Sequence, residues 1–293
     1  MNDPRLRDII NSKEGEKTSA EIILFPSDEG VKINGGRTGA ANAPSLILDQ
    51  LLKLTPHPLH VKKHISFLEN IHVCDDLVCS GNVEKDQELL GKTVAESFQK
   101  GAIPIILGGG HETAFGHFLG YAAVEKPVNI LNIDAHSDVR PLKNGQAHSG
   151  SPFYQAINHS SKLCSSYNVA GINPASISED HFNFVKKQGE CLMESETTLL
   201  SVKKIIQDLD QGNLMITMDM DAVNQGQAPG VSAPNSSGIS SSLWLDLAYE
   251  FGKNPAVTSF DISEVNPEYD RDHQTVRLAA MTIWKFLLGI ALR

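Results

Sequence analysis

The sequence predicts an α/β protein built on a largely parallel β-sheet that is buried on both faces. Short apolar runs alternate along the chain with longer amphipathic stretches, an order typical of a parallel sheet covered by helices. The chain has 293 residues without a repeat, a low-complexity tract or a long linker, so we expect one domain over residues 1–293. The charged start of the chain, about residues 1–20, is expected to be a short mobile segment.

Seven apolar runs have the length and composition of buried strands. A strand covered by helices on both faces is hydrophobic throughout rather than alternating in polarity. In chain order the predicted strands are residues 21–25 ("EIILF"), 70–74 ("NIHVC"), 103–107 ("IPIIL"), 129–133 ("NILNI"), 167–171 ("YNVAG"), 214–220 ("LMITMDM") and 256–262 ("AVTSFDI").

Two amphipathic stretches between these strands predict helices. Leu90, Val94 and Phe98 recur at four-residue spacing, and Gly101 after them favours a helix end. Residues 197–210, "TTLLSVKKIIQDLD", predict another helix that starts at Thr197 as its N-cap and stops before Gly212.

The composition is that of an ordinary soluble globular protein. Hydrophobic residues make up 41% of the chain and charged residues 20%. The net charge of -10 argues against a nucleic-acid partner, because phosphate binding requires a basic face. The start "MNDPRLRDIINSKEGEK" lacks the apolar core of a secretory signal, and no uncharged stretch is long enough to cross a bilayer. We therefore expect a cytoplasmic protein that acts without a membrane partner.

The four cysteines predict neither disulfides nor a zinc site. Only Cys74 and Cys79 are close in the sequence, and their spacing is not that of a usual zinc or redox pair. We expect these two, together with Cys164 and Cys191, to be reduced and structural.

Side chains that suit a metal ion follow the predicted strand that ends in "NIDAHSDVR". Asp134, His136 and Asp138 occupy alternate positions there. Alternate residues of an extended segment point the same way, so Asp134 and Asp138 can aim at one point and His136 at a neighbouring one. In open α/β sheets, sites form beyond the carboxyl ends of the strands. The spacing therefore predicts a metal site at this edge of the sheet.

Two other strand ends deliver ligands of the same kind. "TMDMDAV" places Asp219 and Asp221 two residues apart, and "LGGGHETAFGHF" places His111 after a tight glycine turn. Four carboxylates that meet in a buried cleft repel one another unless cations offset them. Two imidazoles and four carboxylates suit a pair of manganese ions better than a cysteine-rich zinc site or a single magnesium ion.

Each motif alone also has a purely structural explanation. A lone DxD is usually a solvated loop or a cap, and a histidine after glycines often begins a helix. The coincidence of three strand ends is what favours a metal site. Glu264 in "SFDISEVNP" and His148 in "GQAHSGSPF" are further candidates for the cleft, although alone such residues are commonly ion-paired or inert. Other histidines, such as His57, His60 and His117, are interpreted as structural or surface residues.

The segments "GGGHE", "DAHSD", "MDMDAV" and "DISEVNP", in this order, resemble the ureohydrolase family of arginases, agmatinases and formimidoylglutamases. The resemblance begins at "GVKINGGRTGAANAP", residues 30–44, and extends to the terminal helix around "RLAAMTIWKFL". It implies a three-layer α/β/α fold around an eight-stranded, mostly parallel sheet. It also implies two Mn(II) ions per subunit, bridged by a hydroxide, and a homo-oligomer, either trimer or hexamer.

The resemblance assigns roles to eight of these residues. It implies that Glu264 pairs with the cationic amidine or guanidine group of the substrate and that His148 shuttles protons. The ligands that it implies for one ion are His111, Asp134, Asp138 and Asp219, and those for the other are Asp134, His136, Asp219 and Asp221.

Within the family, the chain looks most like formimidoylglutamase, the enzyme of histidine degradation. The segments that carry this likeness are "DEGVKINGGRTGA" at 28–40, "GGGHETAFGHF", "QAPGVSAP" at 227–234 and "EVNPEYDRDHQTVRLAA". The implied reaction is hydrolysis of N-formimidoyl-L-glutamate to L-glutamate and formamide by attack of the metal-bridging hydroxide.

Arg140 supports this substrate on independent physical grounds. It lies two residues past Asp138, at the expected rim of the cleft. An arginine there attracts a dicarboxylate by bidentate pairing and repels a cationic head group. Lys143, Arg271 and Arg277 could assist, although each is equally well explained as a solvated surface residue.

Three rival functions stay open. Another amidinohydrolase, such as an arginase, agmatinase or guanidino-acid hydrolase, would use the same metal chemistry and release urea. A noncatalytic arginase-like scaffold is disfavoured by the complete ligand set with Glu264 and His148. A dimetal phosphoesterase is disfavoured because no phosphate-cradling loop or basic cluster adjoins the ligands.

Overall fold

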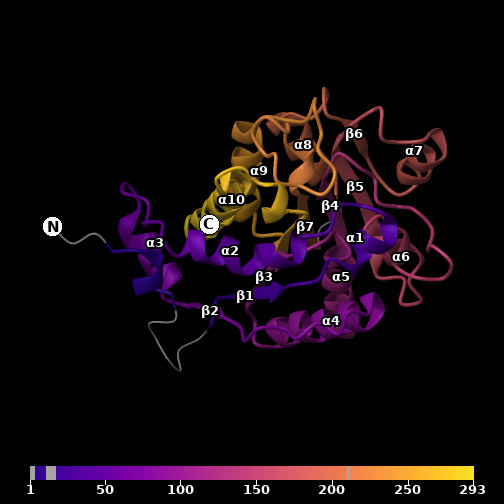
Figure 1. Cartoon of the computed structure of the whole chain (residues 1–293). Helices are drawn as coiled ribbons and strands as arrows, with labels where there is room; N and C mark the ends of the chain where they lie inside the picture. The colour runs from indigo at the N-terminus through magenta and orange to yellow at the C-terminus, as the bar shows by residue number, and fades with distance from the viewer. Residues whose placement is uncertain (1–3, 11–17, 210–211) are drawn as a thin grey trace.

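The computed structural model describes residues 4–10, 18–209 and 212–293. Its centre is one eight-stranded sheet of order β2-β1-β3-β8-β7-β4-β5-β6, in which every strand pair is parallel (Figure 1). The strands are β1 (Ala20–Phe25), β2 (Ile71–Val73), β3 (Ile103–Gly108), β4 (Val128–Ile133), β5 (Cys164–Ile172), β6 (Cys191–Met193), β7 (Asn213–Asp219) and β8 (Val257–Ser263).

Helices cover both faces of the sheet and give the predicted three layers. Helices α2, α8, α9 and α10 lie on one face, and α4, α5 and α6 lie on the other (Figure 1). The helices are α1 (Glu29–Asn34), α2 (Ala43–Leu51), α3 (Val61–Leu68), α4 (Val83–Gln99), α5 (Thr113–Ala123), α6 (Pro152–Asn158), α7 (Glu179–Lys186), α8 (Leu199–Asp208), α9 (Ser241–Lys253) and α10 (Gln274–Ala291). Short 3-10 turns occur at Leu6–Asp8, Ala40–Asn42, Met220–Ala222 and Pro267–Tyr269.

The two helical layers bury separate apolar cores. Trp244 and Phe286 pack against β8 on one side of the sheet, whereas Phe118 and Phe153 pack against β4 and β5 on the other. Because both faces are covered, the central strands β4 and β7 are buried along nearly their whole length and consist mainly of apolar residues.

The seven predicted strands are confirmed, and the structure adds the short edge strand β6, which the prediction missed. The predicted helix around Leu90 is α4, and the one after Thr197 is α8. Thr197 was the wrong N-cap. Thr198 is the cap, because its side chain accepts the Ser201 N–H, whereas the Thr197 hydroxyl accepts the Gly171 N–H at 2.9 Å and so holds β5. Asp210, the predicted last residue of this helix, lies outside the described residues.

Of the charged first segment, residues 4–10 are described and packed against the domain. Leu6 is buried, and its N–H donates to the Leu54 carbonyl at 2.9 Å. Residues 1–3 and 11–17 lie outside the described residues, so the expected mobility of the start stays a prediction. All four cysteines are free thiols.

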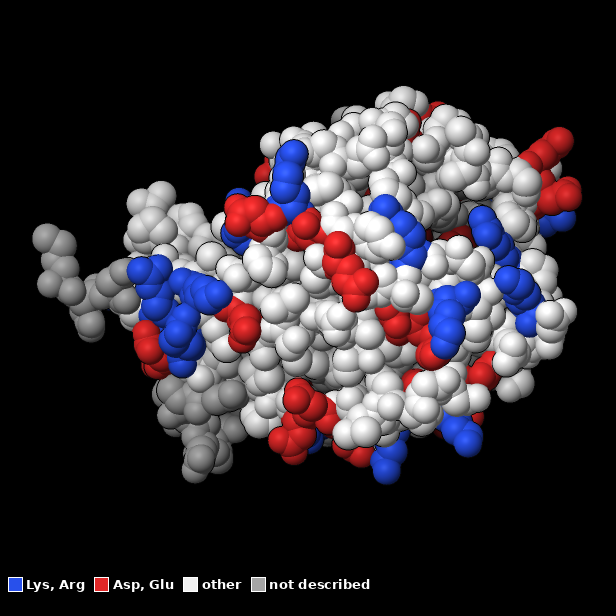
Figure 2. Space-filling model, in the orientation of Figure 1, with Lys and Arg blue, Asp and Glu red and all other residues white. Residues whose placement is uncertain are grey.

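Charge is mixed over the face of the molecule that Figure 2 displays. Basic and acidic side chains are interspersed there, and most of the area carries neither. Among the described residues, no helix is long and apolar enough to span a membrane.

Candidate metal centre and substrate cleft

Four adjacent strands in the middle of the sheet build the candidate site. β3, β8, β7 and β4 lie side by side and run in the same direction, so their carboxyl ends share one edge. Their ends are also level, since Ile133 pairs with Met218 and Asp219 pairs with Ser263. Residues that follow these strands therefore meet although they are far apart in the sequence.

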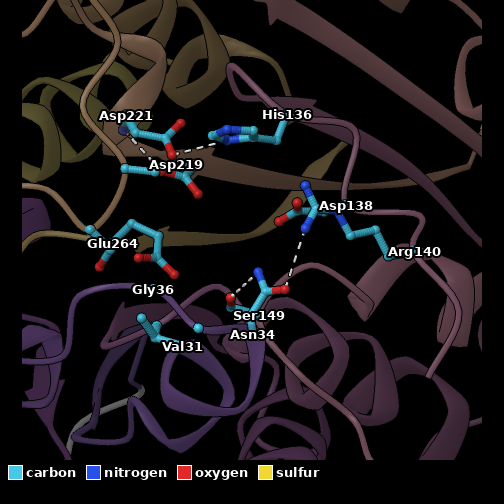
Figure 3. Close-up of a pocket in the computed structure, with 13 residues that line it drawn as sticks. Val31, Asn34, Gly36, His136, Asp138, Arg140, Ser149, Asp219, Asp221 and Glu264 are labelled. Atoms are coloured by element: carbon cyan, nitrogen blue, oxygen red, sulfur yellow. Dashed lines mark hydrogen bonds and ion pairs between the residues drawn. The ribbon is translucent and has the colours of Figure 1, made fainter. Parts of the chain in front are cut away.

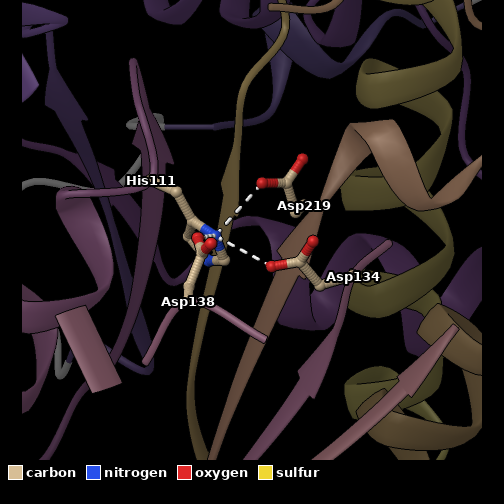
Figure 4. Close-up of side chains that lie close together, drawn as sticks. All are labelled: His111, Asp134, Asp138 and Asp219. Carbon is tan, nitrogen blue, oxygen red and sulfur yellow. Dashed lines mark hydrogen bonds and ion pairs between the residues drawn. The ribbon is translucent and has the colours of Figure 1, made fainter. Parts of the chain in front are cut away.

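The first group of ligands surrounds the imidazole of His111 (Figure 4). Its Nδ1 atom lies 3.2 Å from Asp134 Oδ2, 2.9 Å from Asp138 Oδ2 and 3.1 Å from Asp219 Oδ2. Ligand atoms of the four residues all lie within 4.8 Å of one another, and His111, Asp134 and Asp219 are buried. This arrangement suits one divalent cation with nitrogen and oxygen ligands.

A second group adjoins the first and shares Asp134 with it. Asp134, His136 and Asp221 also have ligand atoms within 4.8 Å of one another. His136 Nδ1 lies 3.1 Å from Asp221 Oδ2 and 3.5 Å from Asp134 Oδ1. Asp134 therefore directs one oxygen to each group, which is the geometry of a bridging ligand.

The structure thus brings all six predicted ligands together, with Asp219 in the first group. The other oxygen of Asp219 accepts the Asp221 N–H at 2.9 Å. Its predicted sharing between two ions stays a prediction.

The electrostatics of the cluster show why cations fit there. Burial raises the pKa of Asp219 and Asp221, and repulsion from neighbouring carboxylates adds to this. The attraction of Asp221 raises the pKa of His136 far above its usual range. Burial lowers the pKa of His111, but hydrogen bonds to three carboxylates outweigh it, so the net shift is upward. The carboxylates thus favour positive charge in their midst.

Unpaired atoms in the cluster support the same conclusion. Asp221 Oδ1 is buried and has no hydrogen-bond partner within the described chain. An oxygen that is removed from water without a partner is costly, and a bound cation removes that cost. The residues present therefore fit a pair of divalent cations.

Two residues of the site have strained backbone conformations. Asp138 and Glu264 have positive φ angles of 44° and 64°, which are uncommon for residues with a side chain.

The backbone at Gly109 crosses close to that of Ser27, which requires a glycine there, because a Cβ would lie 2.0 Å from the Ser27 carbonyl oxygen. The loops after β1 and β3 are joined at this crossing by the hydrogen bond from Gly110 N–H to the same oxygen, at 2.8 Å.

A cleft of about 220 Å³ opens over the second group of ligands (Figure 3). Asp219, Asp221 and Glu264 lie on one side of it and Arg140 on the other. The remaining walls come from α1, the residues after it and two loops. The lining residues are Val31, Asn34, Gly35, Gly36, His136, Asp138, Arg140, Ser149, Asp219, Asp221, Ser232, Ala233 and Glu264.

Glu264 is oriented toward this cleft as predicted. Its Oε1 atom accepts the backbone N–H of His111 at 2.7 Å. Its Oε2 atom is buried without a hydrogen bond to any described residue. Burial raises the pKa of Glu264 to about 7. A cationic ligand group would satisfy Oε2 and keep the carboxylate ionised.

Arg140 lies at the rim, also as predicted, and belongs to a small polar group. It donates to Asn34 Oδ1 at 3.4 Å, and Asn34 Nδ2 donates to Ser149 Oγ at 3.2 Å. Asn34 and Ser149 were missed in the sequence, because a lone asparagine at a helix end and a lone serine in a loop carry no ligand signal. The loop that bears Arg140 is fastened to α1, since Lys143 Nζ donates to the Ile33 carbonyl at 2.7 Å.

The structure does not bring Arg271 and Arg277 to the cleft. Arg277 pairs with Asp272 at 3.1 Å, and Arg271 donates to Gln274 at 3.2 Å. Both are exposed, in keeping with their interpretation as surface residues.

His148 is buried next to the cleft but does not line it. Its Nδ1 accepts the Gly150 N–H at 3.1 Å, and its Nε2 lies 3.1 Å from the Pro141 carbonyl oxygen. Burial lowers its pKa, which favours the neutral ring. Proton transfer by His148 therefore requires the exchange of one of these backbone hydrogen bonds.

Glu112 is a buried residue of the site that the sequence did not single out. It follows His111 and accepts the Gly30 N–H of α1 at 2.8 Å. Burial and the nearby Glu264 raise its pKa to about 8. Its carboxyl group leaves no room for side chains on two neighbours, since a Cβ on Gly30 would lie 2.6 Å from it and one on Gly110 only 2.2 Å. Glu112 thereby holds the α1 wall of the cleft against the metal-ligand loop.

Comparisons with known proteins agree with this geometry. The model of the arginase family matches residues 18–289. Formimidoylglutamase of Geobacillus thermodenitrificans is 35% identical, over 97% of this chain and 88% of the relative. Formimidoylglutamase of Streptococcus gordonii is 32% identical, over 97% and 86%.

Solved structures show the same fold, and one of them was solved with manganese. The crystal structure of Trypanosoma cruzi formiminoglutamase with Mn²⁺₂ has a TM-score of 0.90 at 28% identity and covers 100% of both chains. Formimidoylglutamase from Bacillus subtilis shares the fold, with a TM-score of 0.86 over 99% of this chain and 93% of that one, at 23% identity.

These findings, with the eight-stranded parallel sheet and the cluster at its carboxyl edge, indicate a hydrolase acting on C–N bonds of amidines. The family model covers nearly the whole chain, and the fold is the one that the resemblance implied. The chain belongs to the arginase family.

Proposed function

We propose that this protein is a binuclear manganese hydrolase that converts N-formimidoyl-L-glutamate and water to L-glutamate and formamide, a reaction of histidine degradation. The observation that carries the proposal is the pair of ligand groups that share Asp134 beneath a cleft lined by Glu264 and Arg140. The names of its relatives and the Mn²⁺ of the Trypanosoma cruzi structure support both the substrate and the metal.

The chain offers a complete set of ligands for the two ions. His111 and Asp138 would hold one ion, His136 and Asp221 the other, and Asp134 and Asp219 both. When bound, such a pair lowers the pKa of a water molecule so that hydroxide is available near neutral pH.

Glu264 would orient the reacting group. Its buried Oε2 atom is free to accept a hydrogen bond from the formimidoyl N–H, while Oε1 stays on the His111 backbone. This places the formimidoyl carbon over the ligand cluster. A C–O bond then forms at that carbon, the bond to the glutamate nitrogen breaks, and this nitrogen takes up a proton, with help from His148.

Arg140 gives the cleft its preference for an acidic substrate. The floor of the cleft is carboxylate-rich, whereas its rim carries the guanidinium of Arg140, hydrogen-bonded to Asn34. A substrate with a cationic amidine at one end and carboxylates at the other matches this polarity. Agmatine carries a cationic amine at the end where this substrate class carries a carboxylate, and arginine carries a zwitterionic amino-acid group there. We also propose a cytoplasmic homo-oligomer of three or six subunits, which the family resemblance supports.

Steady-state hydrolysis tests the proposal. Manganese-loaded protein is given N-formimidoyl-L-glutamate, arginine and agmatine in parallel, and glutamate, formamide and urea are measured. We expect turnover of N-formimidoyl-L-glutamate alone. Urea from arginine or agmatine would retain the metal site and overturn the substrate. A manganese-loaded protein that turns over none of the three would overturn the proposed reaction.

A further inference from the structure

The imidazole of His111 has a second partner on the side away from the cleft. Its Nδ1 atom faces three carboxylates, but its Nε2 atom lies 2.9 Å from the hydroxyl of Thr217. Thr217 is fully buried within β7, two residues before Asp219. The Nδ1 edge of the His111 ring thus faces the ligand cluster, and the Nε2 edge faces the interior of the sheet.

The hydroxyl of Thr217 leads to a buried carboxylate that is not a ligand. Thr217 Oγ1 donates to Asp261 Oδ1 at 2.8 Å. The two residues are direct neighbours in the register of β7 and β8, which places their side chains on the same face. Asp261 is fully buried and lies outside the cleft.

The chain of hydrogen bonds continues into α5. Asp261 Oδ2 lies 2.7 Å from His117 Nδ1, and His117 Nε2 lies 2.5 Å from Ser259 Oγ. Tyr121 then bonds Ser259 at 2.6 Å. His117 and Tyr121 are one helical turn apart, and Ser259 and Asp261 alternate along β8, so each pair presents its two side chains to the same side.

Burial of these hydrogen-bonded polar groups lowers the stability of the fold. His117, Ser259, Asp261 and Thr217 are each removed from water between apolar layers. Well-packed apolar residues can replace buried charged groups at little cost to stability, and often with a gain. Stability of the core alone therefore does not account for a carboxylate and an imidazole here. The chain ends on a residue of the metal-ligand cluster, which points to a role there.

The directions of the hydrogen bonds are consistent along this path. If Nδ1 of a neutral His111 is to offer its lone pair to a cation, the ring hydrogen must be on Nε2. That hydrogen is then donated to Thr217 Oγ1, whose own hydrogen goes to Asp261. His117 supplies the second hydrogen bond of Asp261. Along this path each hydrogen-bond donor therefore faces an acceptor.

We propose that Thr217 and Asp261, supported by His117, are positioning residues of the metal centre. They fix the tautomer and the ring angle of His111, so that Nδ1 points at the first ligand group before any ion arrives. The proposal rests on the metal centre proposed above, but not on the identity of the substrate. Partners of this kind, which orient a ligand without touching the metal, typically account for a 10- to 100-fold effect on metal affinity.

Manganese binding tests the proposal independently of turnover. Thr217→Val removes the hydroxyl and nearly preserves the shape. Binding of Mn(II) to metal-free protein is followed by the electron paramagnetic resonance signal of the free ion. We expect one of two sites to weaken by ~10- to 100-fold and the other to change little. Thr217→Ser keeps a hydroxyl and is expected to restore most of the lost affinity.

Thr282→Val is the matched control. Thr282 is also fully buried and accepts a side-chain hydrogen bond, from Trp244 at 2.7 Å, but it lies in α10 away from the cleft. It is expected to change the unfolding transition without changing either manganese affinity. Asp261→Asn gives a second test if Thr217→Val does not fold, and it should weaken the same site.

The outcomes separate this inference from the proposed function. The positioning role is overturned if Thr217→Val or Asp261→Asn folds and still binds two Mn(II) ions as tightly as the unmodified protein. The hydrogen-bonded path from His111 to His117 would then serve only the core. Wild-type protein that binds Mn(II) but does not hydrolyse N-formimidoyl-L-glutamate would overturn the substrate and leave the positioning role standing. Wild-type protein that binds no Mn(II) would overturn both.

Discussion

The backbone N–H of His111 donates to the carboxylate of Glu264 at 2.7 Å. One residue belongs to the first ligand group and follows β3, and the other lines the cleft and follows β8, 153 positions later in the chain. The hydrogen bond therefore sets the place of the Glu264 carboxylate, the proposed amidine-binding group, relative to the proposed metal ligands. The remaining oxygen of Glu264 has a fixed direction into the cleft.

Glu264→Gln tests the part that the charge plays in this relationship. The amide oxygen can keep the bond to His111, but the side chain no longer attracts a cationic amidine. A hydrogen bond to a charged group contributes about 1.5–3 kcal/mol, so we expect kcat/KM to fall by ~10- to 100-fold. Manganese content should be unchanged. Equal kcat/KM in the variant would remove Glu264 from substrate binding.

Asp134→Ala is expected to abolish binding of both ions, because Asp134 directs one oxygen to each ligand group. Elemental analysis after dialysis against Mn(II) measures the loss, and activity should fall with it. Asp246→Ala, on the exposed face of α9, is the control and should keep both ions. Two ions in the Asp134 variant would refute the bridging assignment.

Arg140→Ala is expected to raise the KM for N-formimidoyl-L-glutamate by ~10-fold or more with a smaller change in kcat, because it removes binding shared by the ground and transition states. Arg277→Ala removes an arginine that pairs with Asp272 away from the cleft and should leave KM unchanged. If both variants keep the original KM, the acidic specificity of the cleft must come from other residues.

His148→Asn is expected to fold, to bind manganese and to lower kcat by ~10² or more, the usual range for lost general acid-base assistance. The His148 ring makes two hydrogen bonds to the backbone and must release one of them to move a proton. The variant therefore tests whether the ring transfers protons or only holds its loop. Steady-state kinetics with metal analysis measure both properties. Unaltered kinetics would show that His148 only shapes its loop.

We expect the buried His64, which lies away from the metal centre, to make the stability of the fold depend on pH. Burial lowers its pKa to about 4, with repulsion from His57 and His60. Because the unfolded chain takes up this proton near pH 6.5 and the folded chain near pH 4, the free energy of unfolding falls as the pH drops through that window. The slope is about 1.4 kcal/mol per pH unit.

His64→Asn should remove this component, and the exposed His72→Asn should not. Urea denaturation in EDTA between pH 7 and pH 4 compares the three proteins. Parallel curves for the His64 variant and the unmodified protein would contradict the assignment.

The sequence predicted most of this architecture because apolar runs and amphipathic stretches are local signals. It missed β6, which has three residues, and it placed the α8 cap one residue early, because Thr197 and Thr198 are both good capping residues. The six proposed ligands were predictable since each lies at, or within a few residues after, the end of a strand that has a clear apolar signal.

The rest of the site depends on contacts that no local pattern carries. Asn34 lines the cleft because α1 folds back over the sheet edge, and Thr217 meets Asp261 only through the register of β7 and β8. His117 was interpreted as a structural or surface residue, but its partner Asp261 lies 144 residues away. Such pairings follow from the order of the strands, which the sequence alone did not specify.

The strand order also affects how the protein folds. β4 has β5 and β7 as neighbours. β3 pairs with β8, although β4, β5, β6 and β7 lie between these two strands in the sequence. Contacts of such long sequence separation form slowly, because the entropy of closing large loops is lost before the contacts stabilise the sheet. The ligand set is therefore complete only when the central sheet is complete. Metal binding can then stabilise the finished fold by mass action, but it cannot guide the early steps of folding.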